Sequence, residues 1–389
     1  MKKRFRLMLL AGAALGLSIA AVAPAAQARH GVLAAKQARV GAPTALAGYT
    51  EIPELAVQQA SYKLGAATNP GIVLASDQTN DATAKITIFS PPGYTSNLTQ
   101  APGSTVGKAY AVVKAIIAGV PLLLPLQGPV VVGNPTDPSL VAAYAQCKSP
   151  TDPPTPQEVL VLNTSFQGQT ISVPDFINTA GPYVTQEICL LPPSQAPFNA
   201  QLVVANFTVN GVWTNAPTAG QYQWVADFTP FNGNTPNPAE TVEVRTYVGL
   251  PSSFTLKRLK SKPSIVKFSG KIAIGGVSPA GLQVRLYYGL KSKPAPNFLN
   301  PSEAGTLGTN GKSVRSKALK SKGTFAFTRK KVKKKTYFQA RLDDEWALSG
   351  GCIGPSPTGQ PIPCLQELIS PMTSNQILVK PPKKKRKHH

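Results

Sequence analysis

Hydrophobic and polar residues alternate along most of this chain, and this alternation limits the possible folds more than any other feature. Tyr222, Trp224 and Phe228 alternate with Gln223 and Asp227, a period of two residues that is typical of strands with one buried face. The 32 glycines and 38 prolines suit many short strands joined by turns. Other alternating runs cover residues 85–89, 159–162, 170–173, 184–191, 201–209 and 242–248. The sequence therefore predicts an all-β fold with two or three antiparallel β-sandwich domains.

The first 28 residues have the form of an export signal. A cationic start at 2–6 precedes an uncharged stretch at 7–26, and Ala26-Gln27-Ala28 matches a signal-peptidase site. We expect a signal peptide over residues 1–28 and a mature chain that is secreted or associated with the cell envelope, without a transmembrane span. The alternative is an uncleaved anchor helix, because about 20 apolar residues can cross a bilayer.

A second uncharged stretch, residues 115–133, raises the same question. Pro121, Pro125 and Pro129 interrupt it, and prolines at this spacing repeatedly remove helix donors. We therefore expect buried strands rather than a membrane helix. A short helix over residues 108–117 is the alternative for the beginning of this region.

Four cysteines follow the signal: Cys147, Cys189, Cys352 and Cys364. An even number in an exported chain favours disulfides over free thiols. Of the three connectivities, we expect the most local one, Cys147 with Cys189 and Cys352 with Cys364. Zinc binding is the weaker alternative, because structural zinc sites need paired short spacings or histidine.

Histidine occurs only at His30, His388 and His389, so residues 31–387 contain none. This absence excludes serine–histidine and cysteine–histidine nucleophiles and HExxH zinc peptidases from that span. The chain also lacks the phosphate-binding and dinucleotide-binding glycine motifs, so we expect no cofactor and no enzymatic activity. A polysaccharide hydrolase or lyase that uses carboxylates or tyrosine is the enzymatic alternative.

Positive charge is concentrated in the last third of the chain. Residues 29–250 hold 9 Lys+Arg and 12 Asp+Glu, whereas residues 251–389 hold 27 and 5. Clustered cations bind polyanions by releasing counterions, so we expect a polyanion-binding surface and an anionic cell-envelope polymer as partner. The candidate residues are Lys257, Arg258, Lys260, Lys262, Arg329, Lys330, Lys331, Lys333, Lys334, Lys335, Lys383, Lys384, Lys385, Arg386 and Lys387. The alternative is that these lysines only solvate the surface and protect edge strands.

Sequence-specific nucleic-acid binding is not expected, because no helix-turn-helix, zinc-finger or RNP pattern accompanies the charge. The run 382–387 has the form of a nuclear-import signal, but this conflicts with the export signal at the other end of the chain. We expect residues 380–389 to form a disordered basic tail.

Residues 251–379 alternate with lysine as the polar partner. Val266, Phe268 and Ile272 alternate with Lys267 and Lys271, which we expect to face solvent, and further strands are predicted near 282–286, 325–327, 338–342 and 377–379, with a turn at 310–311. These runs resemble immunoglobulin-like or fibronectin type III-like modules of secreted bacterial proteins. The resemblance implies a Greek-key sandwich without catalytic residues, in which the 352–364 disulfide staples an insertion before the last strand. Residues 40–250 resemble no family and are expected to form one domain or two.

A few polar groups in the chain are weaker site candidates. Asp343-Asp344-Glu345 and the pair Asp77 and Asp81 could bind calcium or act as acid and base, although such groups are common in solvated loops. Tyr222 and Trp224 could stack on a sugar, but inward aromatic side chains on a strand usually belong to the core. Glycosylation sequons begin at Asn97, Asn163 and Asn206.

These features together predict a secreted, non-catalytic, envelope-associated structural or binding protein whose basic module and tail contact polyanions. A carbohydrate-binding adhesin is a further alternative to the enzyme.

Overall fold

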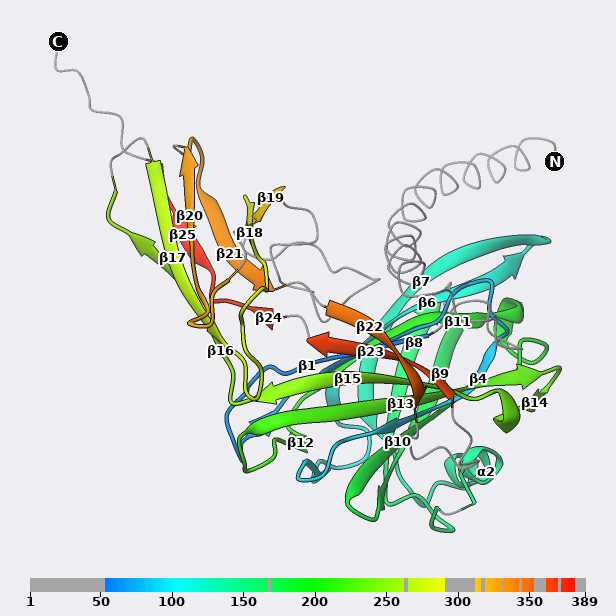
Figure 1. Cartoon of the computed structure of the whole chain (residues 1–389). Helices are drawn as coiled ribbons and strands as arrows, with labels where there is room; N and C mark the ends of the chain where they lie inside the picture. Colours follow the sequence, from blue (N-terminus) through cyan, green and yellow to red (C-terminus); the bar gives the residue numbers. More distant parts are fainter. Residues whose placement is uncertain are drawn as a thin grey trace, which may run out of the picture.

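The fold was analysed in a computed structural model (Figure 1), which describes residues 53–150, 152–166, 169–261, 265–290, 312–315, 319–330, 332–342, 345–352, 362–369 and 372–381. Nearly all regular structure is β, which confirms the predicted fold class. The export signal, the turn at 310–311, Asp343, Asp344 and residues 382–389 lie outside the described residues.

Most strands before residue 250 form one continuous antiparallel sheet. Its strand order is β1-β3-β11-β6-β7-β8-β9-β10-β4-β13-β15, with β14 paired to β13. The bounds are β1 (Glu54–Gln58), β3 (Gly71–Ala75), β4 (Thr83–Phe89), β6 (Thr105–Ile117), β7 (Val120–Val132), β8 (Glu158–Phe166), β9 (Gln169–Ala180), β10 (Tyr183–Cys189), β11 (Gln201–Val209), β13 (Gly220–Asn232), β14 (Thr235–Pro236) and β15 (Val242–Leu250). A small sheet adds β2 (Ala67–Thr68), β12 (Trp213–Thr214) and β5 (Thr95–Ser96).

The sheet folds back on itself, so that β1 packs against β15 and the inner side chains share one core. Aromatic rings fill its centre: Trp224 lies 5.1 Å from Tyr94 and 5.6 Å from Trp213 between ring centroids. Trp224 is completely buried and Tyr222 packs against the same core. These two aromatics are therefore core residues, and the sugar-stacking alternative is wrong for Trp224.

Residues 253–379 contribute a second core between two further sheets. One sheet contains β16 (Ser253–Leu259), β17 (Ile265–Ala273) and β20 (Thr324–Lys330). The other contains β18 (Val284–Gly289), β19 (Lys312–Arg315), β21 (Thr336–Leu342), β24 (Met372–Thr373) and β25 (Ile377–Val379). Phe268 and Phe338 meet across the two sheets with ring centroids 4.8 Å apart, whereas Lys267 and Lys271 are exposed as predicted.

A hairpin from the later part of the chain returns to the first sheet. Strand β22 (Glu345–Cys352) pairs with β23 (Ile362–Ile369), and β23 pairs with β15 in parallel, with Glu243 opposite Cys364. All other pairings between the described strands are antiparallel. The segment that the family resemblance predicted to be an insertion in the second module therefore extends the sheet of the first half.

Residues 105–132 form a long hairpin of two 13-residue strands, β6 and β7. The predicted strands over 115–133 are confirmed, but their predicted burial is wrong near the turn, where Ile116 and Val120 are exposed. The alternative helix over 108–117 is wrong. β6 forms ladders with β7 on one side and β11 on the other, and these tertiary pairings outweigh its weak helical pattern. No helix in the described residues is long and apolar enough to span a membrane.

The α-helix α2 (Pro138–Cys147) was not predicted from the sequence. Asp137 caps its first turn by accepting hydrogen bonds from the backbone N–H groups of Ser139 and Leu140, and Pro138 occupies the first helical turn. An aspartate before a proline is a known helix-start signal, so this element could have been found. Two short 3-10 helices, η1 (Pro197–Asn199) and η2 (Pro238–Glu240), complete the regular structure.

Candidate polyanion-binding surface

The turns of the two sheets formed by residues 253–379, here called the second unit, bring six exposed cations to one end. Ile265 at the start of β17 lies opposite Lys330 at the end of β20, and Thr336 at the start of β21 lies opposite Val379 at the end of β25. The connections after β16 and β20 and the residue after β25 therefore meet at this end, which is the upper left in Figure 1. We call it the basic end; its exposed cations are Arg258, Lys260, Lys333, Lys334, Lys335 and Lys380.

The outer face of the β16–β17–β20 sheet continues this positive surface. Near the basic end, Lys257 on β16 and Lys267 on β17 are exposed, whereas the exposed Lys271 lies at the opposite end of the sheet. Their cross-strand neighbours on this face include Ser269 and Thr328, and the three strands contain no aspartate or glutamate. No carboxylate on these strands can therefore neutralise the lysines. Because β16 is an edge strand, its lysine also fits the alternative of edge protection.

Not every candidate residue belongs to the basic end. Arg329 packs inward, with its guanidinium carbon 4.1 Å from the centroid of the Tyr288 ring, so its charge is engaged in a cation–π contact. Lys335, in contrast, keeps its exposure while its Nζ lies 5.5 Å from the Tyr337 ring centroid. The side chains of Lys262, Lys330, Lys331, Lys383, Lys384, Lys385, Arg386 and Lys387 lie outside the described residues.

One of the two expected disulfides is present. Cys147 at the end of α2 and Cys189 at the end of β10 are bonded, with a Cα–Cα distance of 5.9 Å. The side chains of Cys352 and Cys364 lie outside the described residues, so their pairing stays a prediction.

A row of buried acidic side chains crosses the first sheet beside this disulfide. Glu187 on β10 and Asp227 on β13 both lie opposite Thr87 on β4, and Asp227 also lies opposite Glu243 on β15. The three carboxyl groups are at most 3% exposed, although the alternating pattern predicted solvent on this face. Among the residues with described side chains, neither oxygen of Asp227 has a hydrogen-bond partner. The sequence missed this row because its members come together only through the register of four strands.

Burial raises the pKa of each acid in this row, because the charged form loses hydration. The pKa of Asp227 rises to about 8, first through burial and then through the nearby Glu243. Burial likewise raises the pKa of Glu187 to about 7 although the Lys85 ammonium opposes the rise. Burial raises the pKa of Glu243 against the neighbouring Arg245.

The predicted pair Asp77 and Asp81 lies in a local turn, and the predicted group 343–345 is not tested. Asp77 accepts hydrogen bonds from the backbone N–H and the hydroxyl of Thr79, which is a local turn, and Asp81 is exposed. The side chain of Glu345 lies outside the described residues, like Asp343 and Asp344. Among the residues with described side chains, no group of three His, Cys, Asp or Glu is placed to hold a metal.

The three sequons differ in accessibility. Asn97 is exposed, and Asn163 is partly buried and accepts a hydrogen bond from the Ser172 hydroxyl. Asn206 is completely buried in β11, so a glycan cannot occupy it in the folded protein.

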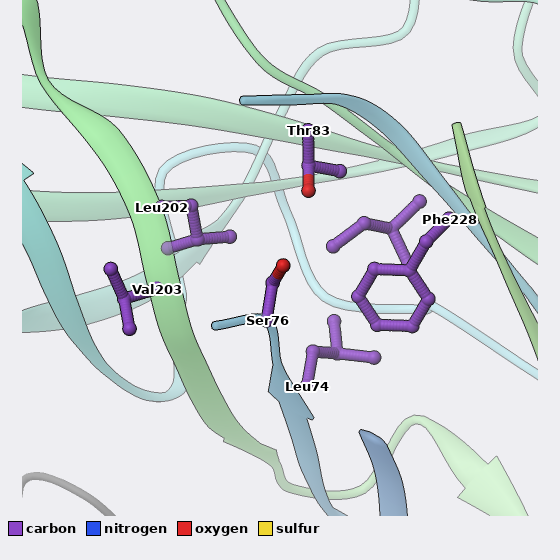
Figure 2. Close-up of a pocket in the computed structure, with 7 residues that line it drawn as sticks. Leu74, Ser76, Thr83, Leu202, Val203 and Phe228 are labelled. Carbon is purple, nitrogen blue, oxygen red and sulfur yellow. The ribbon is translucent and has the colours of Figure 1, made fainter. Parts of the chain in front are cut away.

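Figure 2 shows a small pocket between β3, β4, β11 and β13, with the hydroxyls of Ser76 and Thr83 pointing into it. The side chains leave no room for even a water-sized molecule, so this hollow is far smaller than the roughly 300–1,000 Å³ of typical ligand pockets. The lining residues are Leu74, Ser76, Thr83, Ile86, Leu202, Val203 and Phe228.

Comparisons with known proteins give distant structural likenesses, which include a pilin and PorU. No protein-family model matches the chain, and no curated protein is similar to it in sequence. The full-length major pilin SpaD from Corynebacterium diphtheriae is similar over 82% of this chain and 66% of its own length, with 11% identity and a TM-score of 0.23. Dimeric latent PorU from Porphyromonas gingivalis is similar over 82% of this chain and 34% of its own, with 9% identity and a TM-score of 0.15. Scores this low do not establish a shared fold, so neither protein bears on the function proposed below.

Proposed function

We propose that this chain is an exported, non-catalytic β protein that binds a polyanion of the cell envelope through its basic end and the tail that follows it. The observation that carries the proposal is that the connections after β16 and β20 and the residue after β25 meet at the basic end. Six exposed cations lie there, and the tail, which begins at Lys380, adds five more at 383–387. A surface of this kind attracts linear polyanions without requiring a shaped pocket.

Two further observations support this proposal over an enzyme. The acids of the buried row are at most 3% exposed, so a polysaccharide has no direct access to them. The Cys147–Cys189 disulfide agrees with an oxidising compartment outside the cytoplasm.

Salt-dependent retention on immobilised polyphosphate tests the proposal with the full mature chain. Replacing Lys333, Lys334 and Lys335 with glutamine should weaken retention. The slope of log affinity against log salt should fall by about 2, because three phosphate contacts each contribute about 0.7. Removal of residues 380–389 should also reduce retention on isolated cell envelope at low salt.

The far end of the same unit provides a matched control. Lys271 lies opposite Thr324, so Lys271, Lys320 and Lys322 are exposed cations at the opposite end from Lys333. Their triple glutamine variant has the same net charge as the Lys333, Lys334 and Lys335 variant. Equal losses in the two variants would show that total charge, rather than the basic end, determines binding, and unchanged retention in both would refute the proposal.

A further inference from the structure

The β6–β7 hairpin ends in an apolar tip. Ile117 pairs with Val120 across a two-residue turn in which Ala118 has φ 51° and Gly119 φ 79°. Every side chain from 115 to 125 is apolar. Ile116 is 44% exposed and Val120 54% exposed, which places large aliphatic groups in water at the end of a projecting hairpin. We call residues 115–122 the hairpin tip.

The outer edge of β7 is unsuited to pairing with another strand. β8 pairs with β7 only between Gln127 and Val132, so the described strands leave residues 120–126 without a ladder on that side. Pro121 and Pro125 lie in this segment and have no N–H to donate. Strand addition by a second copy is therefore disfavoured, and a partner of the hairpin tip must contact its side chains.

An aromatic residue and a lysine lie beside the tip. β11 pairs Gln201 with Lys114, so η1 lies next to the end of β6, where Phe198 is partly exposed. Lys114 directly precedes the hairpin tip in the sequence, and its Nζ donates a hydrogen bond to the Gln78 carbonyl at 3.0 Å. The four elements β6, β7, β11 and η1 contain Lys108 and Lys114 but no aspartate or glutamate.

We propose that the hairpin tip inserts into the interfacial layer of an anionic lipid membrane. Ile116, Val120 and Phe198 would enter the boundary of the acyl chains, and Lys114 would face the lipid phosphates. The apolar tip matches the acyl boundary in polarity, and Lys108 and Lys114 supply positive charge on the strand behind it. The acids nearest in the sequence to the Lys114 contact, Asp77 and Asp81, lie in the adjoining loop that contains Gln78. Figure 1 shows the hairpin tip at the right of the molecule and the basic end at the upper left. The proposal adds a lipid contact to the proposed function and depends on its export, but it uses different residues from the basic end.

Sedimentation of the full mature chain with vesicles tests this proposal. Phosphatidylcholine vesicles with and without phosphatidylglycerol are compared at low and high salt, because high salt screens the basic end. The double variant I116N/V120N should bind anionic vesicles about tenfold more weakly at high salt, since two aliphatic groups no longer leave water. In V120W, tryptophan emission should shift to shorter wavelength when vesicles are added.

Leu191, 59% exposed after the end of β10, provides the matched control, and L191N should bind as the unmodified chain does. The melting temperature of each variant verifies that the exposed substitutions leave the fold intact. Equal vesicle binding by I116N/V120N and the unmodified chain, or the absence of an emission shift in V120W, would overturn the proposal. If I116N/V120N lost self-association but still bound vesicles, the hairpin tip would be a contact between two copies of this chain instead. Weak retention on polyphosphate would contradict only the proposal that the basic end binds polyanions, because that assay contains no lipid.

Discussion

Lys85 on β4 donates a hydrogen bond from its Nζ to Oε1 of Glu187 on β10 at 3.0 Å. The same ammonium donates to the Cys147 carbonyl at 3.1 Å and to the Ser149 hydroxyl at 2.8 Å. One lysine therefore joins the sheet to the end of α2 and the segment that follows it, beside the Cys147–Cys189 disulfide.

Substitution of Lys85 by methionine should destabilise the protein in a pH-dependent manner. At pH 8 the variant must either bury the Glu187 carboxylate without its cation or bind a proton there, at a cost of about 3 kcal/mol. At pH 5 the cost should be smaller, because burial already raises the pKa of Glu187 to about 7 and the protonated acid needs no counter-charge. Urea unfolding at both pH values measures the difference, with exposed Lys108→Met as the control. An equal cost at both pH values would contradict this account.

Loss of the Cys147–Cys189 disulfide should lower the free energy of unfolding by about 2–4 kcal/mol, because the bond closes a loop with a sequence separation of 42. The C147S/C189S variant is compared with the unmodified chain in denaturant. Reducing agent should destabilise this variant further, because the predicted Cys352–Cys364 disulfide remains. No effect of reduction on the variant would contradict that second disulfide.

Raising the pH from 5 to 8 should destabilise the fold. An acid whose pKa is raised by folding binds its proton more tightly in the folded state, so stability is lost as pH rises from the unfolded pKa near 4 toward the folded pKa. Burial raises the pKa of Asp227 to about 8, and this carboxyl group lies near Thr87, Glu243, Lys85 and Arg245. D227N should reduce the loss of stability by on the order of 2 kcal/mol. Thermal melts at both pH values provide the measurement, and an unchanged pH dependence in D227N would be the contrary result.

Truncation of Trp224 to alanine should cost about 3–5 kcal/mol, because the indole is completely buried between Tyr94 and Trp213. The exposed Leu259→Ala serves as the control and should change stability little. Intrinsic fluorescence during unfolding measures both. A cost below 1 kcal/mol in W224A would imply that the aromatic cluster repacks around the missing ring.

The alternating pattern predicted the strands well where one face is apolar. The predicted run 201–209 coincides with β11, and the lysines that alternate with Val266 and Phe268 are exposed as expected. The pattern was less informative where both faces are covered. Glu243 alternates with Val242 and Val244 and was expected at the surface, but it is completely buried. Glu243 accepts a hydrogen bond from Arg245 on its own strand and lies between Asp227 of β13 and Cys364 of β23, and a local period cannot reveal these cross-strand neighbours.

The basic end was predictable in composition but not in arrangement. The sequence identifies Lys260 and Lys333 as members of separate clusters, and only the pairing of Ile265 with Lys330 brings those clusters to one end. The same limitation applies to Arg329, whose stacking on Tyr288 depends on packing between two sheets. The sequence shows which residues are charged, but only the topology shows which residues lie next to them.

The parallel pairing of β23 with β15 has a practical consequence for anyone who divides this protein into pieces. A fragment that ended at Leu250 would lack the strand that pairs with β15, and its unpaired backbone groups would invite aggregation. A limited-proteolysis product cut between residues 250 and 345 should accordingly keep its two parts associated until denaturant separates them.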